Sequence, residues 1–231
     1  MEENLNKISV AIPTYEASGF GAQYLSRNLE ILSKQSFKNF DVVISDNSEN
    51  SDIEKVADNY KQKLAIKFFK NANRGMSVNL NNCLKKCTGQ FIKIVFLDDF
   101  LFHENSLMDI SDNLDESTFW LITACEHTKD GSTFYRPFYP RYNHMIHLGN
   151  NTISSPSVLT IKNFDDKLFF DENLTWLMDV DYYKRCYIKF GNPKILNKIN
   201  VVNTTSPTQT SSVITKDQIK KEFIYSKEKF E

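Results

Sequence analysis

The sequence predicts an α/β fold in which a mostly parallel central sheet is flanked by helices. Strand-like and helix-like patterns alternate through the first hundred residues, which is typical of a doubly wound sheet. A short polar cluster follows each of the four strand-like segments in this half. Because ligands bind beyond the carboxyl ends of the strands in such sheets, we expect the four clusters to converge on one rim.

Length and composition describe an ordinary globular chain of 231 residues, 41% hydrophobic and 25% charged, with a formal net charge of −1. One domain is expected at this length, and the lack of a basic excess predicts no nucleic-acid partner. No apolar run reaches the roughly 20 residues of a membrane span, and the polar, acidic N-terminus is not a secretory signal. The four cysteines have no CxxC spacing, so we expect buried free thiols and a reduced, cytoplasmic protein.

The first half of the chain contains strand and helix patterns in regular order. Apolar, β-rich runs predict strands at 7–15, 40–48, 64–71 and 91–98. Helical spacing of apolar residues and helix-start signals predict helices at 24–36, 51–60 and 73–89. Ser51 and Glu54 have the spacing of a capping box, and Gly89 is a natural residue to end the third helix.

The second half is less regular. Strands are expected at 119–128, 131–143, 153–163 and 193–205, with Gly131 joining the first two. A helix is expected at 176–191, ended by Gly191. The last residues predict an amphipathic helix that begins after Thr215, because Thr215 and Gln218 have capping-box spacing.

The segment "FIKIVFLDDFLF" runs an apolar strand into two adjacent carboxylates, Asp98 and Asp99. Burying either charge alone costs several kcal/mol (about 2–7 for a polar group without a partner) or shifts its pKa. A divalent cation relieves the repulsion, because Mg²⁺ and Mn²⁺ prefer oxygen ligands. The alternative is that the pair caps the following segment or lies solvated in a loop. Its position after a strand, beside other polar strand ends, favours a Mg²⁺ or Mn²⁺ site.

The order of three segments resembles family 2 glycosyltransferases with the GT-A fold: "ISVAIPTYE", "FDVVISDNSENSD" and "NANRGMSVNLNNCLKKCTGQFIKIVFLDDFL". The resemblance covers the first hundred residues and continues more loosely through "GNNTISSPSVLTIKN" and "WLMDVDYYKRCYIKFG". It implies one GT-A domain over 1–231. The resemblance assigns nucleotide-sugar binding to 1–100 and acceptor binding to 101–215, and 216–231 is the C-terminal amphipathic helix.

The resemblance also implies a set of donor-binding residues. Asp46 takes the position that hydrogen-bonds the base, usually uracil, although an Asx-turn explains it as well. Arg74 would reach toward the nucleotide, where a cation suits a diphosphate; a surface arginine at a helix start is the alternative. The full set of implied nucleotide-binding residues is Thr14, Tyr15, Glu16, Asp46, Asn73, Arg74, Asn79 and Asp98.

The Asp pair corresponds to the family's D-x-D-D region, but Phe96 stands where the first Asp belongs. The resemblance therefore makes Asp98 the main metal ligand, with Asp99 assisting. Some members of the family also use a late histidine as a ligand. No histidine follows His147 here, so the segment "NTTSPTQTSS" offers only hydroxyl or amide oxygens.

Inverting sugar transfer needs a carboxylate that deprotonates the acceptor hydroxyl. The resemblance places this base at Asp179 in "LMDVDYYKR", with Asp181 as the alternate and Met178 in place of the usual preceding Glu. An Asp in the first turn of a helix is also favoured by the helix dipole, so a purely structural role stays open. Candidates for contact with the sugar or acceptor are Trp176, His147 and Asn150, and a core role is as reasonable for Trp176.

The implied activity is metal-dependent transfer of a sugar from a nucleoside diphosphate, with UDP favoured, to a hydroxyl of a glycan or lipid-linked acceptor in cell-surface polysaccharide synthesis. A catalytically silent GT-A module that binds nucleotide sugar or glycan is the alternative. A nucleotidyltransferase is disfavoured, because "PTYEASGFGAQ" has no Lys or Arg. The lysines of the C-terminal helix permit peripheral contact with a membrane, at its inner face. The alternative is that this helix packs on the domain.

Overall fold

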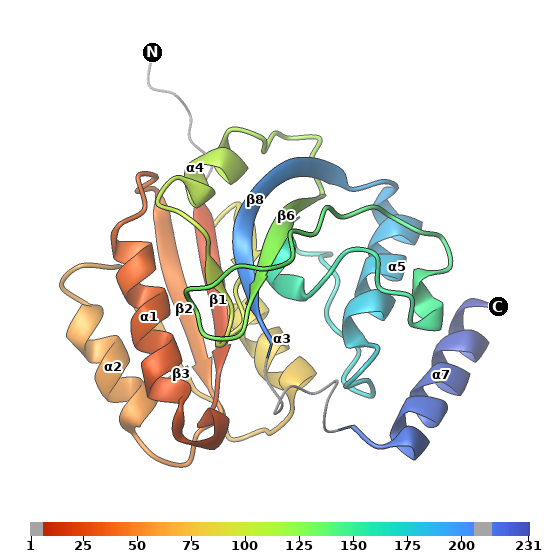
Figure 1. Ribbon diagram of the computed structural model, residues 1–231, viewed down its shortest axis with the longest axis horizontal. Coiled ribbons are helices and arrows are strands. Elements are labelled where there is room, and N and C mark those ends of the chain that lie inside the picture. Colours follow the sequence, from red (N-terminus) through yellow and green to blue (C-terminus); the bar gives the residue numbers. More distant parts are fainter. Residues whose placement is uncertain (1–6, 206–213) are drawn as a thin grey trace.

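The computed structural model describes residues 7–205 and 214–231. Strands from both halves of these residues form one central sheet of eight strands (Figure 1). The strand order is β3-β2-β1-β4-β7-β6-β8-β5. The strands are β1 Ile8–Thr14, β2 Phe40–Asp46, β3 Ile66–Lys70, β4 Phe91–Ile94, β5 Phe100–Leu101, β6 Trp120–Thr128, β7 Leu159–Lys162 and β8 Lys194–Thr204.

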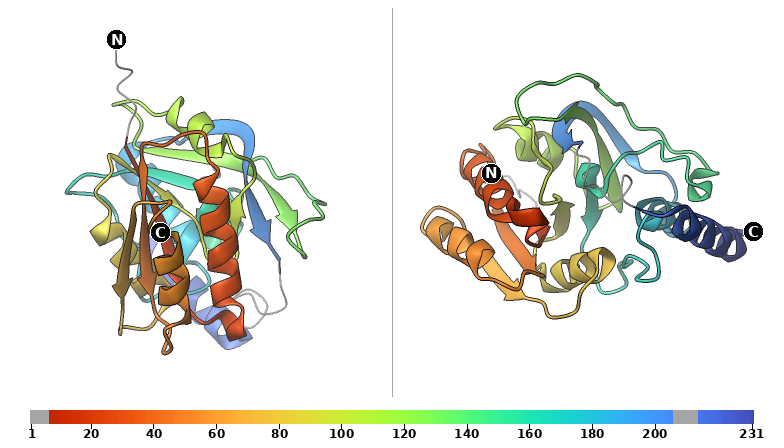
Figure 2. Two further views of the ribbon diagram at one scale, coloured as in Figure 1. Left: turned by 90° about the vertical axis from the view of Figure 1, so that its left-hand side faces the viewer. Right: turned by 60° about the horizontal axis from the view of Figure 1, so that its bottom comes forward.

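Helices cover both faces of the first half of this sheet. α1 and α2 pack side by side on one face of β1–β3, and α3 packs on the other (Figure 2). The α-helices are α1 Gly21–Ser33, α2 Asp52–Tyr60, α3 Met76–Lys86, α4 Ser106–Ser111, α5 Met178–Phe190 and α7 Lys216–Phe230. The described residues also form the short 3₁₀ helices η1 Ala17–Gly19, η2 Ile146–Leu148 and η3 Pro156–Val158.

The first four strands form a parallel sheet, which confirms the α/β fold class. β1 pairs in parallel with both β2 and β4, and β2 pairs in parallel with β3. Every residue of β1 is buried, because helices cover both faces of the sheet. The second half joins through β7, which is antiparallel to β4 and β6, whereas β6 and β8 are parallel. The carboxyl ends of β1, β2 and β4 therefore meet at one edge.

Several predicted elements are confirmed. Leu25, Leu29 and Leu32 form the buried face of α1. At the start of α7, the Thr215 side chain and the Gln218 side chain form the predicted capping box. α5 ends at Gly191, whose φ of 79° favours glycine. All four cysteines are free and buried.

Other boundaries differ from the predictions. The helix predicted to end at Gly89 ends at Lys86, because Gly89 instead packs against β1: its N–H donates to Ser9 Oγ at 2.9 Å, and an added Cβ would lie 2.6 Å from the Ser9 nitrogen. The Ser51 side chain makes no capping hydrogen bond, although a helix does start at Asp52.

The largest error is the strand predicted at 131–143. This segment is a loop whose strand-type pairing with β6 is limited, among the described residues, to isolated bridges at Phe134 and Phe138. The strand expected at 91–98 ends at Ile94, and the strand expected at 153–163 is reduced to β7 after η3. The short elements β5 and α4 were not predicted.

The C-terminal helix α7 packs beside the start of α5, at the end of the molecule farthest from α2 (Figures 1 and 2). Its outer face exposes Phe223 and Ile224, so the expected membrane contact stays a prediction. Within the described residues, no helix combines the length and apolar character needed to cross a bilayer.

Candidate active site

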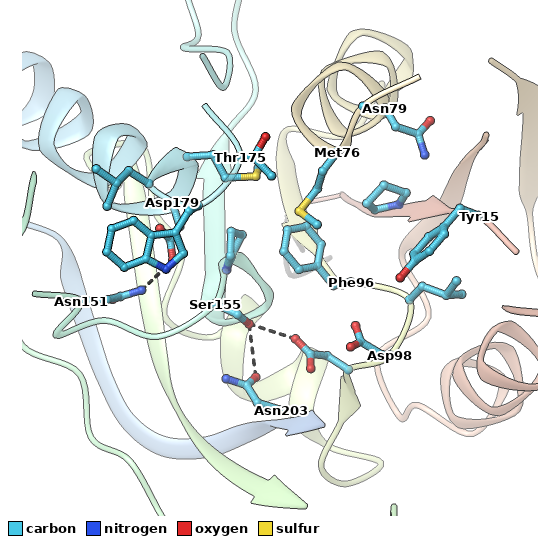
Figure 3. A pocket seen from close by; sticks show the side chains of 18 of the residues that line it. Tyr15, Met76, Asn79, Phe96, Asp98, Asn151, Ser155, Thr175, Asp179 and Asn203 are labelled. Atoms are coloured by element: carbon cyan, nitrogen blue, oxygen red, sulfur yellow. Dashed lines mark hydrogen bonds between the residues drawn. The ribbon is translucent and has the colours of Figure 1, made fainter. Parts of the chain in front are cut away.

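A cavity of about 720 Å³ opens where the carboxyl ends of β1, β2 and β4 face loops of the second half (Figure 3). The predicted convergence of polar strand ends is therefore present. Its lining includes eight of the predicted site residues: Tyr15, Glu16, Arg74, Asn79, Asp98, Asp99, Trp176 and Asp179. Six predicted residues do not line it: Thr14, Asp46, Asn73, His147, Asn150 and the alternate base Asp181.

The side of the cavity formed by the first half of the chain is built around the end of β1 and the start of α3. Asn79 on α3 donates to the Thr14 carbonyl at 3.0 Å and accepts from Ser45 Oγ at 2.7 Å, which locks the helix onto both strands. At the outer edge, the Glu16 carboxylate accepts from the Glu49 N–H, and Arg74 forms an ion pair with the Glu49 carboxylate.

Asp46 lies behind the cavity wall instead of on it. Its carboxylate is fully buried, accepts from Thr14 Oγ1 at 3.1 Å and from Ser48 N–H at 3.1 Å, and pairs with Lys70 at 2.8 Å. The Asx-type bond to Ser48 matches the alternative reading of this residue. The neighbouring Asn47 lines the cavity and donates to the carbonyls of Asn71 and Asn73. Asn73 therefore supports a lining residue through its backbone carbonyl. Contact between the Asp46 carboxylate and a nucleotide base would require breaking these hydrogen bonds and the ion pair with Lys70.

The two adjacent carboxylates occupy different environments. Asp99 is buried, and its two oxygens accept from the Thr204 N–H at 2.9 Å and from Ser155 Oγ at 2.9 Å. Asp98 is half-buried and points into the cavity (Figure 3). Among the described residues, only its own backbone N–H bonds its carboxylate. Asp99 therefore anchors the end of β8, while Asp98 is available to a ligand.

The turn that carries the pair is held from α1 by a residue that the sequence did not identify. Arg27 Nη2 donates to the Asp98 carbonyl at 2.6 Å, and its guanidinium lies 4.2 Å from the centre of the Phe100 ring. Burial raises the pKa of the Asp98 carboxyl, and the charge of Arg27 opposes this shift. Burial, followed by the charge of Asp98, raises the pKa of Asp99. Two carboxylates this close repel each other, so ionisation of both Asp98 and Asp99 is unfavourable unless a cation is bound beside them.

The donor atoms suit a cation that is shared with a substrate. Across 7–205 and 214–231, no three or more His, Cys, Asp or Glu residues are grouped so as to hold a metal by themselves. Mg²⁺ is usually held by one or two carboxylates together with substrate phosphates. Asp98 alone offers free carboxylate oxygens, so the expected assistance from Asp99 is indirect, through the position of the turn. Of the late polar segment, 206–212 lies outside the described residues.

Asp179 lies in the first turn of α5, on the wall contributed by the second half of the chain (Figure 3). Its carboxylate accepts from Asn151 Nδ2 at 2.6 Å and from the Val180 N–H at 2.7 Å. Burial raises the pKa of this carboxyl to about 7, although both hydrogen bonds oppose the shift. A carboxyl with such a pKa can accept a proton near neutral pH.

The alternate base, Asp181, faces away from the cavity. Its carboxylate is fully buried and forms ion pairs with Arg185 at 2.7 Å and Lys229 at 2.6 Å. Both of its oxygens are therefore engaged in holding α5 and α7 together. The geometry favours Asp179 over Asp181 as a group that could reach a substrate.

The three acceptor-side candidates are placed differently from one another. Trp176 lines the cavity and packs closely against Gly149, where an added Cβ would lie 3.2 Å from the indole. His147 is buried, with its ring 5.2 Å from that of Phe230. Asn150 is exposed and does not line the cavity, whereas its neighbour Asn151 does.

Several lining residues from the second half were not predicted. Ser155 Oγ lies between the carboxylate of Asp99 and the amide oxygen of Asn203, and so links the acidic turn to β8 (Figure 3). His127 and Arg136 also line the cavity. The run "GNN" is a sequence signal in this region, but Asn150, the residue predicted from it, lies one position before Asn151.

Comparison with known proteins agrees with this geometry. Residues 9–174 match the sequence family described as Glycosyl transferase family 2, which is more than half of the chain. The chain belongs to this family. A glucosyltransferase from Campylobacter jejuni, named as acting on GalNAc(5)-diNAcBac-PP-undecaprenol, is 32% identical over 96 residues, which cover 40% of this chain and 29% of the relative. The poly(ribitol-phosphate) beta-N-acetylglucosaminyltransferase TarS of Staphylococcus aureus is 29% identical over 114 residues, 48% of this chain and 19% of TarS.

Solved structures show the same fold. A crystal structure of S. aureus TarS 1-349 with UDP-GlcNAc superposes with a TM-score of 0.73 at 20% identity, covering 97% of this chain and 70% of that one. A mannosyltransferase from Pyrobaculum calidifontis with GDP-Man and Mn²⁺ gives a TM-score of 0.64 at 14% identity, covering 89% and 59%. The alignments span 29%, 14% and 57% of the length of the first three curated relatives.

Proposed function

We propose that this family 2 enzyme is an inverting, metal-dependent glycosyltransferase that uses a nucleoside-diphosphate sugar, with a UDP-sugar favoured. The proposed acceptor is a hydroxyl of a glycan or lipid-linked carrier in cell-surface polysaccharide synthesis. The observation that carries the proposal is that two carboxylates from the two halves of the chain, Asp98 and Asp179, line one cavity. The nucleotide sugars bound to structural neighbours, and the acceptors in the names of relatives, support the substrate classes.

The donor would lie along the rim formed by the first half. Tyr15, Glu16 and Asn47 surround the part of the cavity beyond β1 and β2, where a base and ribose would fit. Arg74 supplies a cation at the same rim, which suits the diphosphate. Asp98 would hold Mg²⁺ or Mn²⁺ together with diphosphate oxygens. A cation there supplies electrostatic stabilisation of the leaving group.

Asp179 is the proposed general base. Its carboxylate would take the proton of the acceptor hydroxyl as that oxygen bonds to the anomeric carbon, while the bond from this carbon to the diphosphate oxygen breaks. Attack from the side opposite the diphosphate inverts the anomeric centre. Asn151 fixes the carboxylate by donating to one oxygen. Trp176 offers an apolar surface for a sugar ring close to this base.

Replacement of Asp179 tests the assignment directly. Asp179→Asn removes the base but keeps size and one acceptor oxygen, so transfer should fall about 10²- to 10⁴-fold. Released nucleoside diphosphate would be measured with a panel of UDP- and GDP-sugars and Mn²⁺, and nucleotide affinity would be measured by calorimetry. Asp166→Asn, at an exposed carboxylate outside the cavity, is the matched control. Wild-type turnover in Asp179→Asn would refute this role.

A catalytically silent nucleotide-sugar module is the second candidate. Two observations favour it: Phe96 replaces the first Asp of the acidic motif, and only one free carboxylate faces the cation position. Incubation with the same panel of donors and Mn²⁺ separates the two functions. Slow release of UDP or GDP without an acceptor supports an enzyme, whereas binding without any release supports the silent module.

A further inference from the structure

Glu222 on α7 binds three consecutive backbone N–H groups of a segment about 45 residues earlier. Its Oε1 accepts from the Thr175 N–H at 3.0 Å, and its Oε2 accepts from Trp176 at 2.9 Å and Leu177 at 2.8 Å. Hydrogen bonds to an ionised acceptor are roughly twice as strong as neutral ones. One side chain therefore fixes the whole turn that leads into α5.

This contact fixes the chain at the point where it enters α5. The first N–H groups of a helix have no partners within the helix, and Leu177 at the N-cap position of α5 has no side chain that can accept. A carboxylate near a helix N-terminus is also favoured by the helix dipole. Glu222 thus bonds the N–H of the N-cap residue Leu177 and of the two residues before it, whereas the Val180 N–H inside the helix is bonded by Asp179 Oδ1.

The segment that Glu222 holds is part of the active-site cavity. Thr175, Trp176 and Leu177 all line it, and the proposed base Asp179 follows two residues after Leu177. The orientation of the first turn of α5 decides where the Asp179 carboxylate points. A change at Glu222 can therefore reach the base without any contact between Glu222 and a substrate.

Further contacts fasten α7 to the same region. Lys229 bridges Asp171 and Asp181, at 2.6 Å from each carboxylate, on both sides of the 175–177 turn. Ser226 Oγ donates to the His147 carbonyl at 2.8 Å. His147 belongs to η2, which leads through Gly149 to Asn151, the hydrogen-bond partner of Asp179. α7 thus contacts both segments that position the base.

We propose that Glu222 is a positioning residue for Asp179, and that α7 is a structural part of the active site. This inference rests on the proposed function of Asp179 as the base. The donor rim lies on the first half of the chain and has no contact with Glu222 in the structure. Loss of Glu222 should therefore lower kcat and leave the KM for the donor nearly unchanged.

The test compares Glu222→Ala and Glu222→Gln with the wild-type full chain. Glu228→Ala is the matched control, because Glu228 is an exposed glutamate on the same helix. Hydrogen exchange of the amides of 175–177 measures the contact, and donor turnover with Mn²⁺ measures its effect on the base. We expect faster exchange at 175–177 and a fall in kcat of about 10- to 100-fold in Glu222→Ala, since displacement of about 1 Å can cost that much. Glu222→Gln keeps one acceptor oxygen, so its exchange rate at 175–177 and its kcat should lie between those of the wild type and of Glu222→Ala.

The outcomes are separable. Faster exchange with an unchanged kcat, or unchanged exchange in both variants, would overturn the positioning role. A rise in donor KM equal to the loss in kcat/KM would also overturn it, because the effect would then lie in donor binding. If Glu222→Ala does not fold, Glu222→Gln decides between the same outcomes. A wild-type chain that turns over no donor would contradict the proposed function, and the exchange measurement would still decide whether Glu222 orders the turn.

Discussion

Asp179 lies in surroundings that suit a base better than an ion-pair partner. No cation contacts its carboxylate among the described residues; its partners there are an amide side chain and a backbone N–H. Asp181, two residues later, is held by Arg185 and Lys229. Asp181 does not line the cavity, whereas Asp179 does. Two carboxylates in one helical turn therefore have separate tasks, one facing the cavity and one joining α5 to α7.

The raised pKa of Asp179 predicts a pH dependence. The base must be ionised to accept a proton, so kcat/KM should rise with pH through about 7 and level off above it. Asn151→Ala removes a hydrogen bond that stabilises the ionised form, so the pKa and the midpoint of the profile should move to higher pH. Turnover of the preferred donor from pH 5.5 to 9 measures both. A flat profile in the wild-type enzyme would contradict the role of Asp179.

Single residues also mark the limit of what the sequence could predict. The chain has an acidic residue at the end of β2 and an amide in "GNN", and both were expected in the site. The structure buries Asp46 and leaves Asn150 in solvent, while the neighbours Asn47 and Asn151 face the cavity. β2 is covered on both faces, so its pattern of apolar residues does not indicate which of two adjacent polar residues points outward.

At the scale of elements, the first half was predictable and much of the second was not. β1, α1, β2 and α3 carry apolar patterns that identify them without knowledge of the fold. The 131–143 segment has the composition of a strand, but in the described part of the chain its backbone pairs with β6 only at two isolated bridges. Arg27, Ser155 and Glu222 act through partners that lie 45 to 71 residues away in the chain. Local sequence patterns hold no information about such pairs.

The connection from α3 to β4 gives a prediction about stability. Gly89→Ala would place a Cβ 2.6 Å from the Ser9 nitrogen and 2.8 Å from the Lys7 carbonyl oxygen, and backbone atoms cannot move aside cheaply. We expect a loss of about 2–4 kcal/mol in the free energy of unfolding, a range typical of overpacking in a core. Urea denaturation measures it.

Gly19→Ala is the control for that prediction. Gly19 has a φ of 93°, but no atom lies within 4 Å of an added Cβ. The Gly19→Ala substitution should lower the free energy of unfolding by about 1 kcal/mol, because backbone strain is its sole effect. Equal losses at the two positions would show that the close approach of Gly89 to β1 is not what requires glycine there.

At the scale of the whole molecule, one continuous sheet brings the two halves to a shared cavity. The parallel half supplies the strand ends that carry Tyr15 and Asp98. The half joined through β7 supplies Asp179, Asn151 and the end of β8. α7 closes the arrangement by fixing the start of α5 through Glu222. The proposed roles in donor binding and proton removal therefore fall on residues from different halves, so substitutions can alter them separately.

Calorimetric titration of UDP, with and without Mn²⁺, tests the central claim most directly, because Asp98 should couple the nucleotide to the cation. We expect Mn²⁺ to tighten UDP binding at least tenfold in the wild-type chain and to have no such effect in Asp98→Asn, while Asp179→Asn behaves like the wild type. UDP binding that is equally strong with and without Mn²⁺, or an Asp98→Asn chain that retains the full effect of Mn²⁺, would contradict the account.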